Sequence, residues 1–147
     1  MKLYLDLCCF NRPFDDQSQL KVRLQTEAKL SVQESIKSRN HILIWSAILD
    51  LENADNPDLE RRTAIAEWKS LAEVDVATTV AVEDLAAILA GGGLKPMDAL
   101  HMASAIEAGA DRFLTTDQQI LRRMKSDARI RVLDPVEFIC EMEAVDQ

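Results

Sequence analysis

The feature that most constrains the fold is the alternation of short apolar segments with longer amphipathic ones. Short segments rich in strand-forming residues predict strands at residues 2–7, 41–45, 74–77, 112–115 and 130–133. Segments whose apolar residues recur every three or four positions predict helices at residues 18–39, 80–90, 96–106, 118–124 and 135–142. Strands separated by helices form a parallel sheet with helices on both faces. The expected fold class is therefore α/β, a three-layer sandwich around a short parallel five-stranded sheet.

Two further helices are predicted between the second and third strands. Ser46 is suited to cap a helix that contains Glu52, and Pro57 is suited to the first turn of a helix over residues 56–72. The segment Asn11-Arg12-Pro13 is predicted to be a loop that follows the first strand. A chain of 147 residues has the length of one domain, so we expect residues 1–147 to form a single domain.

Composition excludes several classes of protein. The chain has 17 Lys and Arg residues against 25 Asp and Glu residues, a net charge of −8, so a broad basic surface that coats nucleic acid is excluded. The longest nearly apolar stretch, residues 42–49, is far shorter than a membrane-spanning helix, and the N-terminus does not resemble a signal peptide. Cys8, Cys9 and Cys140 support neither a disulfide framework nor a zinc site. We expect a cytoplasmic protein with no membrane partner.

Four acidic residues are predicted to meet at one edge of the sheet. Asp6 ends the first strand and Asp117 follows the fourth, so both lie at the carboxyl edge, where open α/β sheets bind ligands. Asp98 falls in the first turn of the helix begun at Pro96, and Glu52 is the inward acid of its helix. Asp50, about 200° around that helix from Glu52, is expected to face elsewhere.

Carboxylates gathered in this way repel one another unless a cation lies between them. An all-oxygen cluster suits hard cations such as Mg²⁺ or Mn²⁺, which also bind substrate phosphate. Two such ions about 3.5 to 4 Å apart can activate a water and stabilise the leaving oxygen in phosphodiester hydrolysis. The pattern therefore indicates a metal-dependent nuclease.

Five segments together resemble a PIN domain, closest to the single-domain ribonuclease toxins of VapBC-type toxin–antitoxin pairs. They read KLYLD at 2–6, CFNRPFDDQ at 9–17, SAILDLE at 46–52, LKPMDALHMASA at 94–105 and ADRFLTTD at 110–117. The resemblance implies an endoribonuclease that depends on Mg²⁺ or Mn²⁺, forms a homodimer, acts on an RNA substrate and is held inactive by a cognate antitoxin protein. It also implies that Asp6, Glu52, Asp98 and Asp117 are the metal-binding and catalytic acids, with Thr115 as a supporting hydroxyl.

The chain departs from this family just after the first acid. Many relatives have a small polar residue and then Asn or Ser there, whereas this chain has Leu7 and Cys8. Either Asn11 or Thr115 supplies the missing polar contact, or the site is weaker; the sequence leaves these alternatives open. Arg12 and Lys95 are the cations nearest to the matched acids in sequence, and we expect them to contact phosphate.

Other interpretations compete with this one. His101 follows Asp98 by three residues and is expected to be a packed, hydrogen-bonded core residue; the alternatives are an outer partner of the metal site or a general base. A phosphatase with Asp6 as nucleophile would need a second Asp at position 8, which is Cys. The alternative to the nuclease is a non-catalytic PIN-like module that binds RNA or protein. The helices over 56–72 and 80–90 carry more apolar surface than a small sheet needs, which favours a homodimer.

Overall fold

The structure is a computed structural model that describes residues 1–146. Its centre is a parallel sheet with the strand order β3-β2-β1-β4-β5. The strands are β1 (Lys2–Leu5), β2 (Ile42–Ser46), β3 (Val74–Val76), β4 (Arg112–Leu114) and β5 (Arg131–Leu133). Each lies at a predicted position, so the α/β class and the five-stranded parallel sheet are confirmed.

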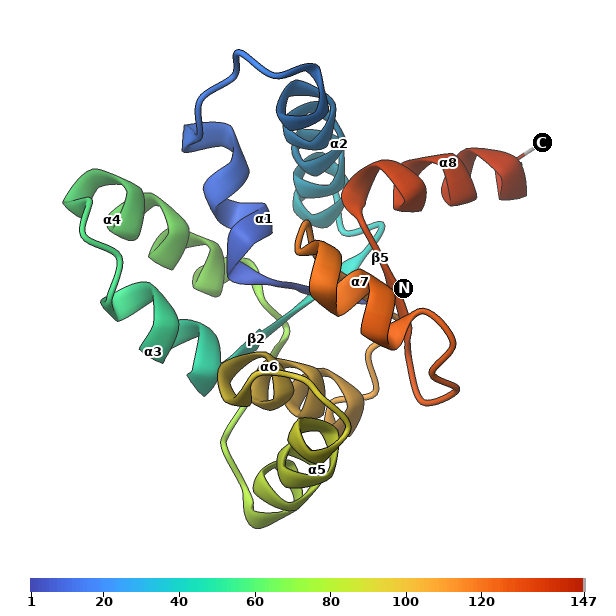
Figure 1. Cartoon of the computed structure of the whole chain (residues 1–147). Coiled ribbons are helices and arrows are strands. Elements are labelled where there is room, and N and C mark those ends of the chain that lie inside the picture. The colour runs from blue at the N-terminus through green and yellow to red at the C-terminus, as the bar shows by residue number, and fades with distance from the viewer. Residues whose placement is uncertain (147) are drawn as a thin grey trace.

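Helices connect the strands and cover the sheet. They are α1 (Leu7–Asn11), α2 (Leu20–Lys37), α3 (Ala47–Ala54), α4 (Leu59–Glu67), α5 (Val80–Gly91), α6 (Pro96–Glu107), α7 (Gln118–Met124) and α8 (Pro135–Asp146), with 3₁₀ turns η1 (Arg12–Phe14) and η2 (Trp68–Leu71). In Figure 1, α1, α2 and α8 lie on one side of the strands, and α5 and α6 lie on the other. This arrangement is the predicted three-layer sandwich. Among the residues that the structure describes, no helix is both long and apolar enough to cross a membrane.

The core lies around β1, because this strand has a neighbour on each edge and helices on each face. Tyr4 is fully buried and its ring stacks on Phe113 of β4, with 5.2 Å between ring centroids. On β2, Trp45 is also fully buried and packs against Phe10 of α1. A strand buried on both faces reads as a continuous apolar run, which is why the short strands could be recognised from sequence.

The predicted apolar face of α2 is buried only in part. Val32 and Ile36 are buried as expected, whereas Leu20 and Leu24 are exposed. With 18 residues, α2 is about 27 Å long and extends beyond the short strands, so its first turn has little core to pack against. Leu20 and Leu24 instead line a shallow pocket together with Val136 of α8.

Two predictions about local structure are wrong. The predicted loop at residues 11–13 is instead the end of α1 and the start of η1, because Asp6 caps α1 and Pro13 falls in a first turn, where a missing N–H costs little. The next helix, α4, begins at Leu59 and not around Pro57. Asp58 is its N-cap and accepts a hydrogen bond from the backbone N–H of Arg61, so the cap decides the start.

Several predicted helix ends are confirmed. The Ser46 hydroxyl accepts the N–H of Leu49 and caps α3. Asp117 caps α7, as the sequence suggested. Gly109, just after α6, has φ +73°, a conformation that glycine adopts without strain. These caps fix where α3, α6 and α7 meet the sheet, and thereby fix the positions of the acids that they carry.

Candidate active site

Asp6 is held at the carboxyl end of β1 by hydrogen bonds to both of its oxygens. Oδ1 accepts the N–H of Leu7 at 2.9 Å, and Oδ2 accepts the hydroxyl of Thr115 at 2.9 Å and the thiol of Cys8 at 3.4 Å. The side chain is buried. Thr115 therefore supplies the polar contact that the sequence left open, and Cys8 adds a weak one. Asn11 does not, because its side-chain oxygen lies 3.3 Å from Asn56 Nδ2.

Glu52 and His101 lie next to Asp6. Glu52, on α3, is partly buried, and its Oε1 atom is 3.3 Å from His101 Nε2. One potential ligand atom from each of Asp6, Glu52 and His101 lies within 4.8 Å of the other two. His101 is buried and hydrogen-bonded, as expected, but it also contacts an acid that the sequence assigned to the site.

Asp98 and Asp117 lie outside this compact group but within reach of its charge. Burial, followed by the negative charges of Asp6 and Asp117, raises the pKa of Asp98 to about 6. Asp98 occupies the first turn of α6, and Asp117 uses Oδ1 to accept the N–H groups of Gln119 and Ile120. The four predicted acids are therefore brought to one region.

The charge of this region is not balanced by a basic side chain. Within residues 1–146, no Lys or Arg forms an ion pair with any of the four acids. Burial raises the pKa of Asp6; His101 and the Thr115 hydrogen bond oppose this shift, and the charge of Glu52 adds to it. A cluster of carboxylate oxygens with one imidazole nearby is a donor set that fits Mg²⁺ or Mn²⁺.

The remaining predicted residues differ in their surroundings. Asp50 faces away from the acids, as expected, and accepts hydrogen bonds from Trp45 Nε1 at 2.9 Å and Lys69 Nζ at 3.0 Å. Arg12 is already engaged, because it donates to Gln25 Oε1 and pairs with Asp15 at 2.9 Å. Lys95 is exposed and immediately precedes α6, the helix of Asp98.

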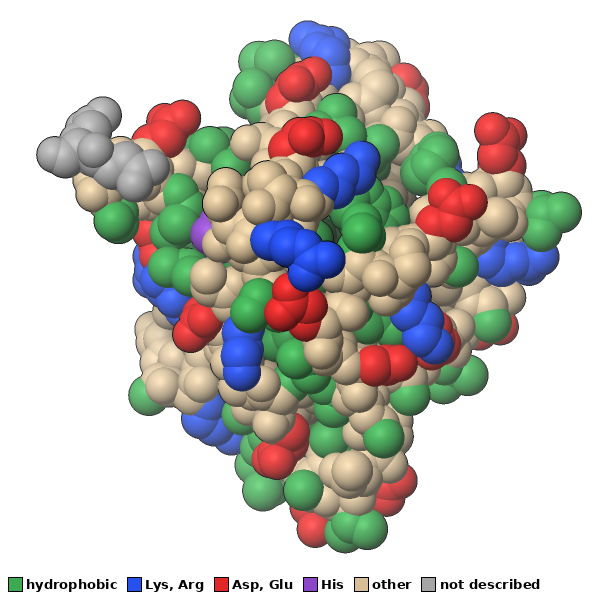
Figure 2. Space-filling model, turned by 180° about the vertical axis from the view of Figure 1, so that it is seen from behind, with side chains coloured by type: hydrophobic (Ala, Val, Ile, Leu, Met, Phe, Trp, Pro, Cys, Tyr) green, Lys and Arg blue, Asp and Glu red, His purple; other side chains and the backbone are tan. Residues whose placement is uncertain are grey.

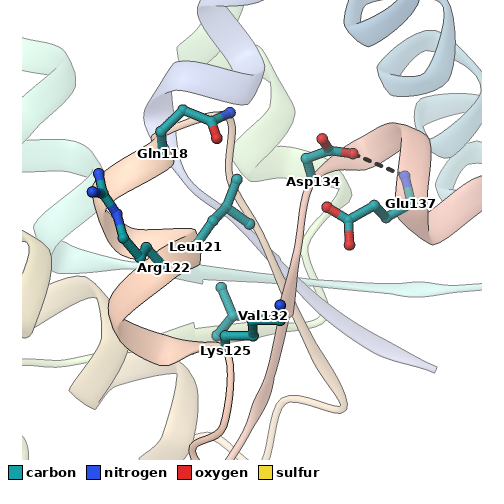
Figure 3. A pocket seen from close by; sticks show the side chains of 7 residues that line it. All are labelled: Gln118, Leu121, Arg122, Lys125, Val132, Asp134 and Glu137. Carbon is teal, nitrogen blue, oxygen red and sulfur yellow. Dashed lines mark hydrogen bonds between the residues drawn. The ribbon is translucent and has the colours of Figure 1, made fainter.

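A separate pocket of about 420 Å³ lies between α7 and the segment from β5 to α8 (Figure 3). One wall comes from α7, which contributes Gln118, Leu121 and Arg122, and the other from β5 and the start of α8. In the second wall, Asp134 accepts the backbone N–H of Glu137. None of the four predicted acids lines this pocket, although Gln118 directly follows Asp117.

Sequence reasoning missed two residues behind the acids, Tyr4 and Ser46. Both are fully buried, and they connect to Glu52 through His101. Tyr4 looked like an ordinary strand residue and Ser46 like a helix cap. The only available signal was a tyrosine two positions before Asp6 together with a histidine three positions after Asp98.

Comparison with known families places these residues in context. A profile of the PIN domain matches residues 8–126. The chain belongs to the PIN domain family. The match includes Glu52, Asp98 and Asp117 and begins two residues after Asp6. No curated protein gives a significant match.

Solved structures share the PIN fold with this chain at low sequence identity. A chain of the VapBC2 complex of Rickettsia felis, bound to promoter DNA, superposes with a TM-score of 0.59 and 14% identity over 91% of this chain and 98% of its own. A chain of FitAcB of Neisseria gonorrhoeae superposes with a TM-score of 0.58 and 16% identity over 90% of this chain and 97% of its own. A chain of DNA-bound VapBC of Salmonella typhimurium superposes with a TM-score of 0.56 and 20% identity over 92% of this chain and 98% of its own. These likenesses establish the fold.

Proposed function

We propose that this PIN domain protein is a metal-dependent endoribonuclease, with Asp6, Glu52, Asp98 and Asp117 as its metal-binding and catalytic acids. The observation that carries the proposal is the convergence of these acids where no described Lys or Arg pairs with them: ligand atoms of Asp6, Glu52 and His101 lie within 4.8 Å of one another, and Asp6 and Asp117 share the Thr115 hydroxyl. A Mg²⁺ or Mn²⁺ ion bound there would generate a nucleophile from water and stabilise the leaving oxygen of an RNA phosphodiester.

Several hydrogen bonds hold the acids of this site in place. Asp6 is oriented by Leu7 N–H, Thr115 and Cys8, so its carboxylate enters the site in one orientation. The N–H of Asp117 donates to the same Thr115 hydroxyl at 3.1 Å, which ties the start of α7 to the end of β1. Asp6 and Asp117 are thereby held together before any ligand binds, and such preorganisation favours catalysis.

Lys95 is the better candidate for a phosphate contact. It is exposed and lies three residues before Asp98, whereas Arg12 has a carboxylate and an amide as partners. Lys95→Ala should weaken RNA binding and flatten its salt dependence, while Arg12→Ala should have the smaller effect. Figure 2 shows acidic and basic side chains interspersed over one face, which supports a local contact rather than a broad basic surface.

We further propose that the protein is the toxin of a toxin–antitoxin pair. The support is the fold shared with chains of the VapBC and FitAcB complexes. An RNA substrate and an antitoxin partner both imply a cytoplasmic location. Cleavage by the purified protein should stop when the product of an adjacent gene is added, and failure of every neighbouring product to inhibit would contradict this part of the proposal.

We also propose a C2 homodimer of single-domain subunits. On α5, Val80 and Ile88 are 71% and 65% exposed, so these apolar side chains do not take part in the packing of α5 on α6. Exposed apolar side chains of this kind favour contact with a second copy of the chain. Light scattering should give about twice the 16.5 kDa mass of the chain at micromolar concentration, and thermal unfolding should show one transition. A mass of one chain at that concentration would contradict the dimer, and two separate transitions would contradict the single domain.

The nuclease activity is tested by comparing the loss of an acid inside the site with the loss of an acid outside it. Wild-type protein should cleave single-stranded RNA with Mn²⁺ and lose that activity in EDTA. Asp6→Asn should reduce cleavage by about 100-fold or more, whereas Asp50→Asn should not, because Asp50 faces Trp45 and Lys69. Equal cleavage in EDTA would refute metal dependence. RNA binding without any cleavage would favour the non-catalytic module.

A further inference from the structure

A buried chain of hydrogen bonds runs behind the acids and ends on Glu52. The Leu49 N–H donates to Ser46 Oγ at 3.1 Å, Ser46 Oγ lies 2.7 Å from the Tyr4 hydroxyl, and that hydroxyl lies 2.6 Å from His101 Nδ1. His101 Nε2 then lies 3.3 Å from Glu52 Oε1. This series of hydrogen bonds crosses four elements, from β2 to β1 to α6 to α3.

The surroundings leave these groups little freedom. Ser46, Tyr4 and His101 are each 0% exposed. The Tyr4 ring is stacked on Phe113 at an interplanar angle of 9° and meets the His101 ring edge-on. Polar groups in such a place are stable only when each donor has an acceptor. The donor and the acceptor of each hydrogen bond in this series can therefore be worked out.

Two directions are available, and only one satisfies every group. If Ser46 donates to Tyr4, then Tyr4 donates to His101 Nδ1, and the His101 proton sits on Nε2, where it meets the Glu52 carboxylate. In the reverse direction Nδ1 carries the proton and donates to Tyr4, which donates to Ser46. The Ser46 proton then has no acceptor among the hydrogen bonds of the described residues, and a bare Nε2 faces a carboxylate oxygen.

We propose that His101 is a positioning residue for Glu52: Tyr4 and Ser46 hold it as the Nε2–H tautomer, and this N–H fixes the Glu52 carboxylate beside Asp6. His101 therefore acts through Glu52 and does not itself bind the ion, although its nitrogen lies among the potential ligand atoms. The consequence for metal affinity rests on the proposed function, whereas the tautomer does not. Outer partners that orient metal ligands typically change affinity by about 10- to 100-fold when removed.

The tautomer can be measured without metal or substrate. The chain has only two histidines, His41 and His101, so long-range ¹H–¹⁵N spectra of protein with labelled histidine, recorded in EDTA, are assigned with His41→Gln. We expect His101 Nδ1 to resonate as an unprotonated nitrogen and Nε2 as a protonated one. Tyr4→Phe keeps the stacked ring but removes the hydroxyl, and it should shift the Nδ1 signal. A proton on Nδ1 in the wild-type protein would overturn the proposal.

Metal affinity separates positioning from direct ligation. Glutamine at position 101 can place an N–H near the position of Nε2, whereas leucine cannot. The dissociation constant for Mn²⁺, read from the electron paramagnetic resonance of free Mn²⁺, should stay within about threefold for His101→Gln and weaken about 10- to 100-fold for His101→Leu. His41→Gln is the matched control and should match wild type, because His41 precedes β2 at the opposite end of the sheet.

Each outcome bears on one claim. Equal weakening by Gln and Leu would mean that His101 is a direct ligand, and no weakening by either would mean that it does not position Glu52; both overturn the proposal. If His101→Leu does not fold, Tyr4→Phe serves in its place and should weaken Mn²⁺ binding severalfold, with unchanged affinity as the contrary result. A wild-type protein that binds no Mn²⁺ would refute the proposed function, while the spectra would still decide the tautomer.

Discussion

The two ends of the parallel sheet differ in whether their acidic side chains are paired with basic ones. At the amino ends of β4 and β5, Glu141 of α8 accepts a hydrogen bond from Arg112 Nε at 3.0 Å and one from Arg131 Nε at 2.9 Å. At the carboxyl ends, Asp6 and Asp98 lie among other acids, and no described Lys or Arg forms an ion pair with either. We call the first end complete, because Arg112 and Arg131 pair with its acid, and the second end incomplete, because no described Lys or Arg pairs with its acids.

The pKa values express the same contrast. Burial would raise the pKa of Glu141, but hydrogen bonds and charge from Arg112 and Arg131 outweigh it and lower the pKa. Burial raises the pKa of Asp98 to about 6, and the neighbouring acids add to that shift instead of opposing it. Because an ionised acid stabilises the fold only where it is paired, Glu141 contributes to stability and Asp98 detracts from it. Such uncompensated groups are typical of functional sites.

The largest effect should come from removing a charge at the incomplete end. Asp98→Asn keeps the size of the side chain but removes one carboxylate, and RNA cleavage in Mn²⁺ should fall about 100-fold or more. The measurement is the initial rate at saturating Mn²⁺, with Glu141→Gln as the matched control at the other end. Comparable loss in both variants would show that the two ends do not differ in function.

The complete end should respond in stability instead. Glu141→Gln leaves Arg112 and Arg131 without their shared carboxylate and should lower the free energy of unfolding by about 1 kcal/mol, or about 3 °C in Tm. Thermal unfolding at pH 7.5 measures this, and cleavage should be unchanged. An unaltered Tm would mean that these partly exposed ion pairs contribute nothing to the fold.

The strands and the acids at the carboxyl edge of the sheet could be predicted from sequence, whereas the pairing of Glu141 with two arginines could not. The strands were recognisable because buried parallel strands read as apolar runs, and Asp6 and Asp117 could be placed at one edge because parallel strands end together. Asp98 was placed by the helix that starts at Pro96. These inferences depend on neighbours in sequence or on the direction of a strand, and so no three-dimensional coordinates are needed for them.

The rest depends on distances between elements, which sequence does not supply. The chain from Ser46 through Tyr4 and His101 joins residues up to 97 positions apart, and nothing local marks them as partners. For the same reason the sequence gives no sign that Gln25 and Asp15 are partners of Arg12. The two wrong helix boundaries have a local cause. Asp6 and Asp58 each accept a backbone N–H at the start of a helix, and these N-caps, not the nearby prolines, decide where α1 and α4 begin.

The smallest expected effect is the pH dependence of stability in the metal-free protein. The pKa of Asp98 is raised to about 6 in the folded state and stays near 3.8 in the unfolded state. Between these values the folded state binds the extra proton, so the contribution of Asp98 to stability falls as pH rises and levels off above pH 6. Removing the charge therefore matters more at pH 7.5 than at pH 5.

In EDTA, Asp98→Asn should therefore raise Tm by about 2 °C at pH 7.5 and by less at pH 5. Adding Mn²⁺ should reverse the order, because a ligand that binds only the folded state stabilises the wild type more than a variant that binds it weakly. Differential scanning calorimetry of both proteins, with and without Mn²⁺, measures all four values at each pH. A lower Tm for the variant in EDTA at pH 7.5 would mean that the Asp98 carboxylate stabilises the fold without a cation, and the contrast between the two ends of the sheet would then be lost.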